Sequence, residues 1–325
     1  MRRRSALKLL VAAPLGASGW ARAQTYPSGP VRIVVPYAAG GGLDTVARNL
    51  AEGLSQKLGQ TFNVDNRPGG GGMIGADAVA KAAPDGMMLL MAADSELTIT
   101  PAVAGRAPYS AASDFAPIVL VAQTPNVLVT SASQKAKTLR EIVDAARRDK
   151  RVLTIGTAGT GTVHHIAVEV LSSSLGLEVT HVPYKGAAPA TVAALGGEID
   201  MALVGAPPLM PHLKSGKLLP LAVTQSARSP LLPEVPTVGQ AVGVMADVDF
   251  VTWFGLLAPA RTPPAVLKTL ETAALAHLGN AEVRTKLNAL GIDVVALPGG
   301  PFSERLRHDA QMYAEVVKRY RIKAD

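Results

Sequence analysis

The chain has 325 residues, 48% of them hydrophobic, and it contains no cysteine. Disulfide bonds, thiolate catalysis and cysteine-ligated metals are therefore excluded, and hydrophobic cores must hold the fold together. The chain carries 32 Lys and Arg against 25 Asp and Glu, a formal net charge of +7. Five of these basic residues and no acidic residue lie within residues 1–23, which leaves +2 for the remainder. The charge of the remainder therefore does not indicate a nucleic-acid partner.

Residues 1–23 have the pattern of an export signal. Four basic residues between positions 2 and 8 precede a short apolar stretch, and Ala21-Arg22-Ala23 forms a cleavage site, so the mature chain should begin near Gln24. The stretch is shorter than the about 20 residues that span a bilayer. We expect export to the periplasm. Arg3-Arg4 resembles a twin-arginine motif, so the Sec and twin-arginine routes both remain open.

After the export signal, short β-branched runs alternate with segments of helical periodicity. The first group predicts strands at 31–35, 62–66 and 87–91, helices at 44–58 and 73–82, and two short strands at 118–121 and 127–130. Such alternation indicates βαβ units on mainly parallel sheets.

The pattern then restarts in a second group. It predicts helices at 138–148, 163–175 and 190–195 and strands at 152–155, 179–184, 201–204 and 219–223. A last strand at 253–258 precedes helices at 264–278, 282–290 and 302–320. Because these three helices cannot bury their apolar faces alone, we expect them to pack on the first group.

This order predicts an α/β protein of two lobes, with the second inserted into the first. Lobe 1 should comprise residues 24–124 and 247–325, and lobe 2 residues 125–246. The chain then crosses between the lobes twice, near 118–130 and 225–255. Two crossings are typical of a hinged clamp that closes on a ligand.

Two glycine-rich loops carry the chemical signal. One runs from Pro36 to Asp44 and the other from Gly156 to Thr162, each from the end of a strand into the start of a helix. Helix N-termini present unpaired N–H groups and partial positive charge, and glycine lets a ligand approach the backbone closely. One such loop from each lobe would suit a carboxylate. Alternatively, both are ordinary turns in which Asp44 and Thr162 cap the helices.

The first loop also carries a resemblance to a known family. The segment Val34-Val35-Pro36-Tyr37-Ala38-Ala39-Gly40-Gly41-Gly42-Leu43-Asp44 resembles the opening strand and loop of the periplasmic receptors of tripartite tricarboxylate transporters, the Bug family. Similar motifs follow in the family's order over essentially the whole mature chain: Asp65-Asn66-Arg67-Pro68-Gly69-Gly70-Gly71-Gly72, Ala80-Lys81-Ala82-Ala83-Pro84-Asp85-Gly86, Asp114-Phe115-Ala116-Pro117, His181-Val182-Pro183-Tyr184-Lys185-Gly186, Leu221-Ala222-Val223-Thr224, Val235-Pro236-Thr237 and Trp253-Phe254-Gly255-Leu256.

The resemblance implies a periplasmic-binding-protein-like (type II) Venus flytrap with no catalytic residues, no cofactor and no metal. It implies a monomer that passes a small organic carboxylate to a membrane permease with a large and a small subunit. It also implies a ligand site with two halves. The first half holds Tyr37, Ala38, Ala39, Gly40, Gly41 and Asp44, and the second Ala158, Gly159, Thr160, Gly161 and Thr162, with Tyr184 and Lys185 nearby.

Three candidate site residues depart from the family pattern. Asp94, Glu96 and His164 stand where small hydroxyl residues are usual. Two acidic groups at the site would repel a polycarboxylate and favour a ligand that bears an amine or a ring nitrogen. Alternatively, both acids cap the next turn and face solvent.

Other functions receive weaker support. Gly70-Gly71-Gly72-Met73-Ile74-Gly75 fits the dinucleotide pattern, but it follows the second strand rather than the first. His165 and Glu169 have the spacing of metal ligands on a helix, without a third ligand at suitable spacing. No nucleophile elbow or phosphate loop supports a hydrolase or a nucleotide-binding enzyme. A receptor that feeds a signalling system instead of a transporter remains an alternative.

Overall fold

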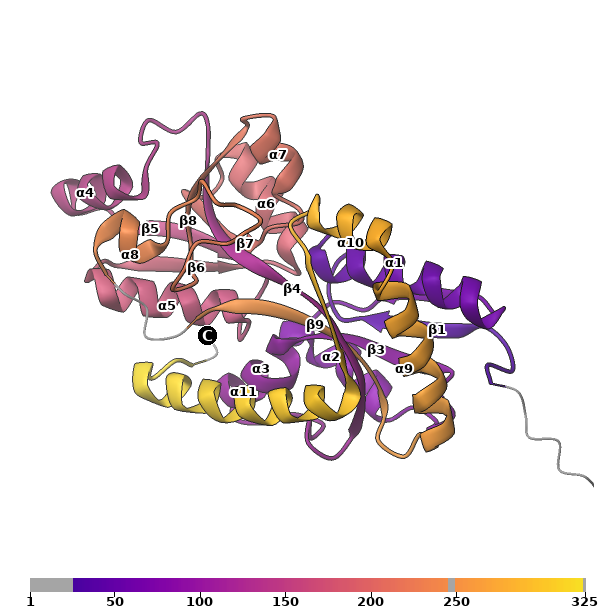
Figure 1. Cartoon of the computed structure of the whole chain (residues 1–325). Helices are drawn as coiled ribbons and strands as arrows, with labels where there is room; N and C mark the ends of the chain where they lie inside the picture. The colour runs from indigo at the N-terminus through magenta and orange to yellow at the C-terminus, as the bar shows by residue number, and fades with distance from the viewer. Residues whose placement is uncertain (1–25, 245–248, 324–325) are drawn as a thin grey trace, which may run out of the picture.

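A computed structural model gives the fold of residues 26–244 and 249–323 (Figure 1). The expected export signal at 1–23 lies outside these described residues. Strands and helices alternate along the chain, and the strands join in the order β2-β1-β3-β9-β4-β7-β5-β6, with β8 and β10 both pairing with β4. Among the described residues, no helix combines the length and the apolar character that crossing a bilayer requires.

The first lobe is built on a mixed sheet. Its strands are β1 (Val31–Val35), β2 (Phe62–Asn66), β3 (Met88–Ala93), β9 (Val251–Pro259), β10 (Asp293–Pro298) and the first part of β4 (Phe115–Ser131). Its helices are α1 (Gly42–Leu58), η1 (Gly70–Gly72), α2 (Met73–Ala80), η2 (Ser95–Ile99), α3 (Thr100–Ala104), α9 (Pro264–Leu278) and α10 (Ala281–Asn288). Apolar residues of α1 at helical spacing, Val46, Leu50 and Leu54, are buried in the core of this lobe.

The second lobe repeats the architecture on a smaller scale. Its strands are β5 (Leu153–Thr157), β6 (Val179–Pro183), β7 (Met201–Gly205), β8 (Leu218–Val223) and the second part of β4. Its helices are α4 (Leu139–Asp149), α5 (Val163–Leu175), α6 (Ala187–Gly196), α7 (Met210–Lys214) and α8 (Val238–Val242). The lobe has separate core clusters on the two faces of its sheet, and one of them also includes Ile99 and Val103 of the first lobe.

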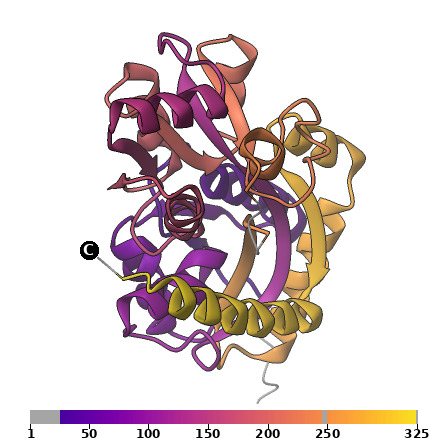
Figure 2. The same cartoon turned by 90° about the vertical axis from the view of Figure 1, so that its left-hand side faces the viewer.

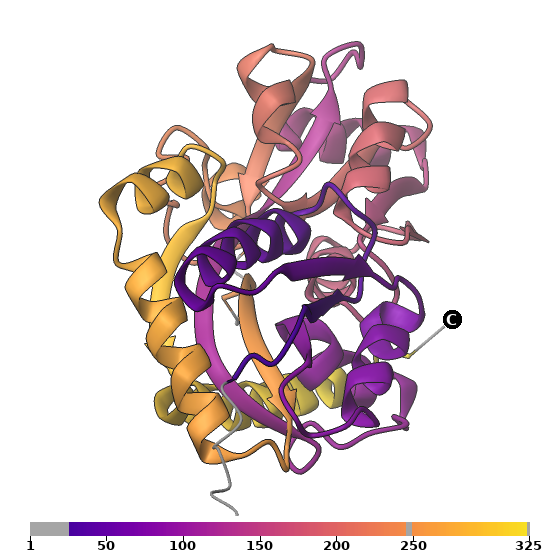
Figure 3. The same cartoon turned by 90° about the vertical axis from the view of Figure 1, so that its right-hand side faces the viewer.

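Strand β4 runs from one lobe into the other (Figures 2 and 3). The sequence predicts two short strands around Pro125, whereas the structure has one continuous strand. Pro125 is the last residue of β4 that pairs with β9, and Asn126 is the first that pairs with β7. Proline lacks an N–H and interrupts a ladder. Here the partner strand changes at that position, so the strand continues through it.

The final helix, α11 (Gly299–Tyr320), contacts both lobes. Its first half carries Phe302 and Leu306 into a core cluster of the first lobe, as the sequence predicts. Its second half carries Tyr313 and Val316 into a core cluster of the second lobe, which α5 also supplies. Figure 2 shows α11 lying below α5. The C-terminal helices thus pack on the first lobe, as expected, except for the second half of α11, which packs on the second lobe.

Direct hydrogen bonds join the lobes. The Ala38 N–H donates to the Lys185 carbonyl at 3.0 Å, and the Val163 N–H donates to Ser95 Oγ at 3.1 Å. Thr100 Oγ1 donates to the Gly161 carbonyl at 2.9 Å. The structure is thus a closed form in which the two glycine loops meet.

Candidate ligand-binding site

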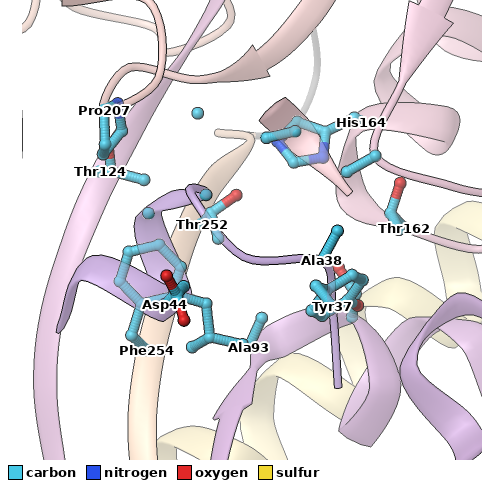
Figure 4. A pocket seen from close by; sticks show the side chains of 17 residues that line it. Tyr37, Ala38, Asp44, Ala93, Thr124, Thr162, His164, Pro207, Thr252 and Phe254 are labelled. Atoms are coloured by element: carbon cyan, nitrogen blue, oxygen red, sulfur yellow. The ribbon is translucent and has the colours of Figure 1, made fainter. Parts of the chain in front are cut away.

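The two loops enclose a cavity between the lobes (Figure 4). The first loop joins β1 to α1 and the second joins β5 to α5, so the N-termini of both helices lie at the cavity. The cavity has about 500 Å³ of space between atoms, its mouth included. It is lined by Tyr37, Ala38, Gly41, Gly42, Leu43, Asp44, Ala93, Ser95, Thr124, Ala158, Thr162, His164, Ala187, Gly205, Pro207, Thr252 and Phe254.

Four of the six predicted residues of the first loop line this cavity: Tyr37, Ala38, Gly41 and Asp44. Ala39 and Gly40 are exposed and do not line it. Asp44 shapes the loop itself, because its Oδ2 accepts the Gly40 N–H at 3.0 Å. Burial acts to raise the pKa of Asp44, but hydrogen bonds from Arg48, Gly40 and Asn66 outweigh it and lower that pKa. Asp44 is therefore a charged carboxylate that its neighbours already neutralise.

The predicted residues of the second loop divide between two cavities. Ala158 and Thr162 line the cavity described above. A neighbouring cavity has about 830 Å³ of space between atoms, its mouth included, and is lined by Gly159, Thr160, Gly161, Tyr184 and Lys185. Tyr37 and Ala158 line both cavities, so these two residues form the partition.

His164 lines the first cavity from the start of α5. Its side chain is buried, and this burial lowers its pKa to about 3, so the imidazole is neutral at physiological pH. Its Nε2 lies 3.1 Å from Asn126 Oδ1 on β4.

Asp94 and Glu96 lie behind the cavity wall, and neither lines either cavity. Both are fully buried, so the alternative that they face solvent is wrong. Glu96 Oε1 accepts the Ala93 N–H at 2.7 Å, and Glu96 Oε2 bonds with the Tyr37 hydroxyl at 2.9 Å. Burial raises the pKa of Asp94 and brings that of Glu96 to about 8. Because these two carboxyl groups are mainly uncharged, they do not repel a polycarboxylate. The charge of Asp94 and Glu96 therefore gives no reason to expect a ligand that bears an amine.

The glycine run at 69–72 lines the neighbouring cavity and packs tightly against the second loop. A Cβ on Gly71 would lie 2.5 Å from the Thr160 carbonyl oxygen, and Gly71 has φ 61. The run thus permits a close approach of backbones between the lobes. The same segment carries the dinucleotide-like pattern, which here leads into the eight-residue helix α2.

Among the described residues, the metal-like pair on α5 belongs to no group of three ligands. His165 Nε2 lies 3.8 Å from Glu169 Oε1, and the His165 ring stacks on His181. Within residues 26–244 and 249–323, no group of three or more His, Asp or Glu side chains could hold a metal ion.

Sequence reasoning missed several lining residues from the strands between the lobes. Thr124 precedes Pro125 in β4, and Thr252 and Phe254 lie in β9. For Thr252, the available signal was a single threonine within an otherwise apolar strand. Ser95, which also lines the cavity, lies in the π-helix η2, for which the sequence predicts no element.

Comparison with known proteins agrees with this architecture. The sequence profile of the tripartite tricarboxylate transporter family receptor (TctC) matches residues 46–318. Three solved structures, each 30% identical in sequence, superpose closely. Rpa4515 of Rhodopseudomonas palustris with adipate has a TM-score of 0.87 and covers 92% of this chain and 99% of its own. The periplasmic binding protein BugD has a TM-score of 0.86 over 92% of this chain and 100% of its own.

The third structure is MatC of Rhodopseudomonas palustris with bound malate. It has a TM-score of 0.83 and covers 90% of this chain and 100% of its own. The fold is thus the two-lobed type II fold of periplasmic binding proteins, which the sequence predicts. The chain belongs to the tripartite tricarboxylate transporter receptor family and is of the Bug type, a family of solute-binding receptors without enzymatic activity.

Proposed function

We propose that this protein captures a small organic carboxylate between its lobes and delivers it to a tripartite tricarboxylate-type permease with a large and a small subunit. The observation that carries the proposal is the cavity that both glycine loops enclose. Relatives of 30% identity bind adipate and malate, which supports a carboxylate ligand for this chain.

The helix N-termini supply the chemistry for a carboxylate. Helices α1 and α5 both begin at the cavity, where Gly42, Leu43 and Thr162 belong to its lining. Unpaired N–H groups and the partial positive charge of a helix N-terminus stabilise an anion without any cationic side chain. The ligand carboxylate would sit there, near Ala38 and Ala158.

The lobes would move about the strands that join them. We place the division at residues 24–124 and 247–325 for lobe 1 and 125–246 for lobe 2, with β4 and β9 as the hinge. The change of pairing partner at Pro125 supports this division. Because α11 contributes to cores of both lobes, its second half would have to shift or bend on opening.

The protein would act in the periplasm as a monomer, exported through residues 1–23 by the Sec or the twin-arginine route. The periplasmic assignment of BugD supports this location.

A binding screen tests the proposal directly. Mature protein beginning at Gln24 would be titrated with dicarboxylates, hydroxy acids, aromatic acids and amino acids, with melting temperature and calorimetry as readouts. A true ligand should bind saturably and without turnover. At 100 times its Kd, it should stabilise the fold by about 2.7 kcal/mol. Catalytic conversion of a ligand, or no binding by any carboxylate, would contradict the proposal.

A further inference from the structure

Three polar side chains form one wall of the cavity on the side of the joining strands. They are Thr124 on β4, Thr252 on β9 and His164 on α5, called here the acceptor wall (Figure 4). Thr124 and Thr252 are register partners in the ladder between β4 and β9. All three side chains are buried, with exposed fractions of 1%, 5% and 6% for Thr124, Thr252 and His164 respectively. Their hydrogen-bonding capacity therefore bears directly on any bound ligand.

Both threonine hydroxyls have already used their only hydrogen. Thr124 Oγ1 donates to the Gly291 carbonyl at 2.8 Å, and Thr252 Oγ1 donates to Asn126 Oδ1 at 2.8 Å. A hydroxyl has one hydrogen and two acceptor lone pairs. Any further hydrogen bond to these two oxygens can therefore only be one that they accept.

The orientation of the Asn126 amide fixes the state of His164. Asn126 Nδ2 donates to the Phe250 carbonyl at 3.1 Å, and a reversed amide would place two acceptor oxygens against each other. Oδ1 therefore faces His164, and it can only accept. Since Nε2 lies 3.1 Å from that oxygen, Nε2 carries the imidazole hydrogen.

His164 Nδ1 is consequently a bare acceptor. The imidazole is neutral, so it carries a single hydrogen, and this hydrogen is on Nε2. Nδ1 is buried and has no hydrogen-bond partner among the described residues. A buried acceptor without a partner is unfavourable, and a ligand that donates to it removes the penalty.

We propose that the acceptor wall selects carboxylates that also bear a hydrogen-bond donor, a hydroxyl or ammonium group, positioned to meet His164 Nδ1. This inference rests on the proposed function and specifies its ligand class. A second carboxylate or an unprotonated ring nitrogen at this position would place its own lone pairs against the lone pair of His164 Nδ1, which is unfavourable. The acceptor wall therefore disfavours ligands that present either group there, and one of these is the ring-nitrogen ligand that the sequence suggests.

Matched pairs of acids test the selection. Three pairs of acids differ by one hydroxyl group: lactate and propionate, malate and succinate, and 2-hydroxyglutarate and glutarate. The corresponding acids with an ammonium group are alanine, aspartate and glutamate. For the chain length that fits, calorimetry should show the donor-bearing acid binding roughly tenfold or more tightly than its deoxy partner. Equal or tighter binding of the deoxy acid overturns the inference while leaving the proposed function intact. If no carboxylate binds, both fail.

A variant of the histidine tests its assigned role. His164→Leu removes the acceptor at similar volume, so the affinity ratio within the selected pair should fall toward one. A change in closure or stability would affect both acids of a pair alike, so the ratio isolates the contact. His212→Leu on α7 changes a histidine outside the cavity lining and should leave the ratio unchanged. A ratio that persists in His164→Leu overturns the role of Nδ1.

The tautomer can be observed independently of any ligand. Nitrogen-15 spectra of the imidazole rings should show His164 with a protonated Nε2 and an unprotonated Nδ1 at pH 7, assigned by the loss of its signals in His164→Leu. A protonated Nδ1 would overturn the inference.

Discussion

Glu96 shows how one buried side chain acts on the site without lining it. Its carboxyl group bonds with the Tyr37 hydroxyl, and Tyr37 belongs to the cavity wall. The Ala93 N–H supplies a second hydrogen bond. Burial of this group brings its pKa to about 8, so the folded protein holds a proton that the unfolded chain releases at much lower pH. The stability of the protein should therefore depend on pH through this residue.

Replacing Glu96 by Gln should reduce that dependence. Between the ordinary carboxyl pKa of about 4.5 and the folded value of about 8, the folded state binds more protons than the unfolded state. Stability of the native protein should thus fall as pH rises across this interval, by on the order of a few kcal/mol from this group. Chemical denaturation at pH 5 and pH 8 should show a smaller fall for Glu96→Gln. An equal fall in both proteins would contradict the buried-proton interpretation.

Among the elements, η1 and the second glycine loop approach each other closely across the lobes. Gly71 packs against the Thr160 carbonyl and the Thr100 side chain, and the single hydroxyl hydrogen of Thr100 lies between the carbonyl oxygens of Gly71 and Gly161, at Oγ1 distances of 3.0 and 2.9 Å. The glycine run at 69–72 thus provides an interlobe contact. Backbone approach of this kind requires the absence of a Cβ.

Gly71→Ala should weaken ligand binding by hindering closure. The added Cβ would lie 2.5 Å from the Thr160 carbonyl oxygen, so the two loops must separate. Affinity for the ligand found in the binding screen should fall by roughly tenfold or more. Gly59→Ala is the matched control, because Gly59 has φ 69 but no atom lies within 4 Å of the point that its Cβ would occupy. Both variants should lose about 1–2 kcal/mol from left-handed strain, whereas only Gly71→Ala should lose affinity. Equal affinities of the two variants would refute the contact.

At the scale of the whole molecule, the two lobes are joined by β4, β9 and α11. One core cluster in each lobe belongs to that lobe alone, whereas another second-lobe cluster also includes residues of η2, α3 and α11, so opening would have to rearrange this shared cluster. The interlobe hydrogen bonds described above lie around the cavity. A ligand that contacts both loops therefore favours the closed form by its differential affinity.

Small-angle scattering should detect this closure. Without ligand, a fraction of molecules should be open, and the radius of gyration should fall as the ligand found in the screen saturates the protein. The Gly71→Ala variant should show a larger radius at saturation than the native protein. A radius that stays constant across a saturating titration would contradict hinge closure.

The sequence by itself determined the class of fold, most elements and the two loops. Helices at 163–175 and 264–278 and the strand at 62–66 have the predicted bounds, because local periodicity and flanking turns specify them. Motifs spread over the chain also indicated the family, which the comparison confirmed. These features depend on residues that are near one another in sequence.

Tertiary structure alone decided which candidate residues meet the cavity. Asp94 and Glu96 follow a strand just as a site residue would, but the π-helix η2 turns both into the interior. Thr124 and Thr252 are far apart in the sequence and become neighbours only through the pairing of β4 with β9. The acceptor state of His164 depends on Asn126 and Phe250, which belong to other segments of the chain. The direction and burial of these side chains, and the positions of their hydrogens, depend on contacts between residues that are distant in sequence. No local sequence pattern therefore predicts them.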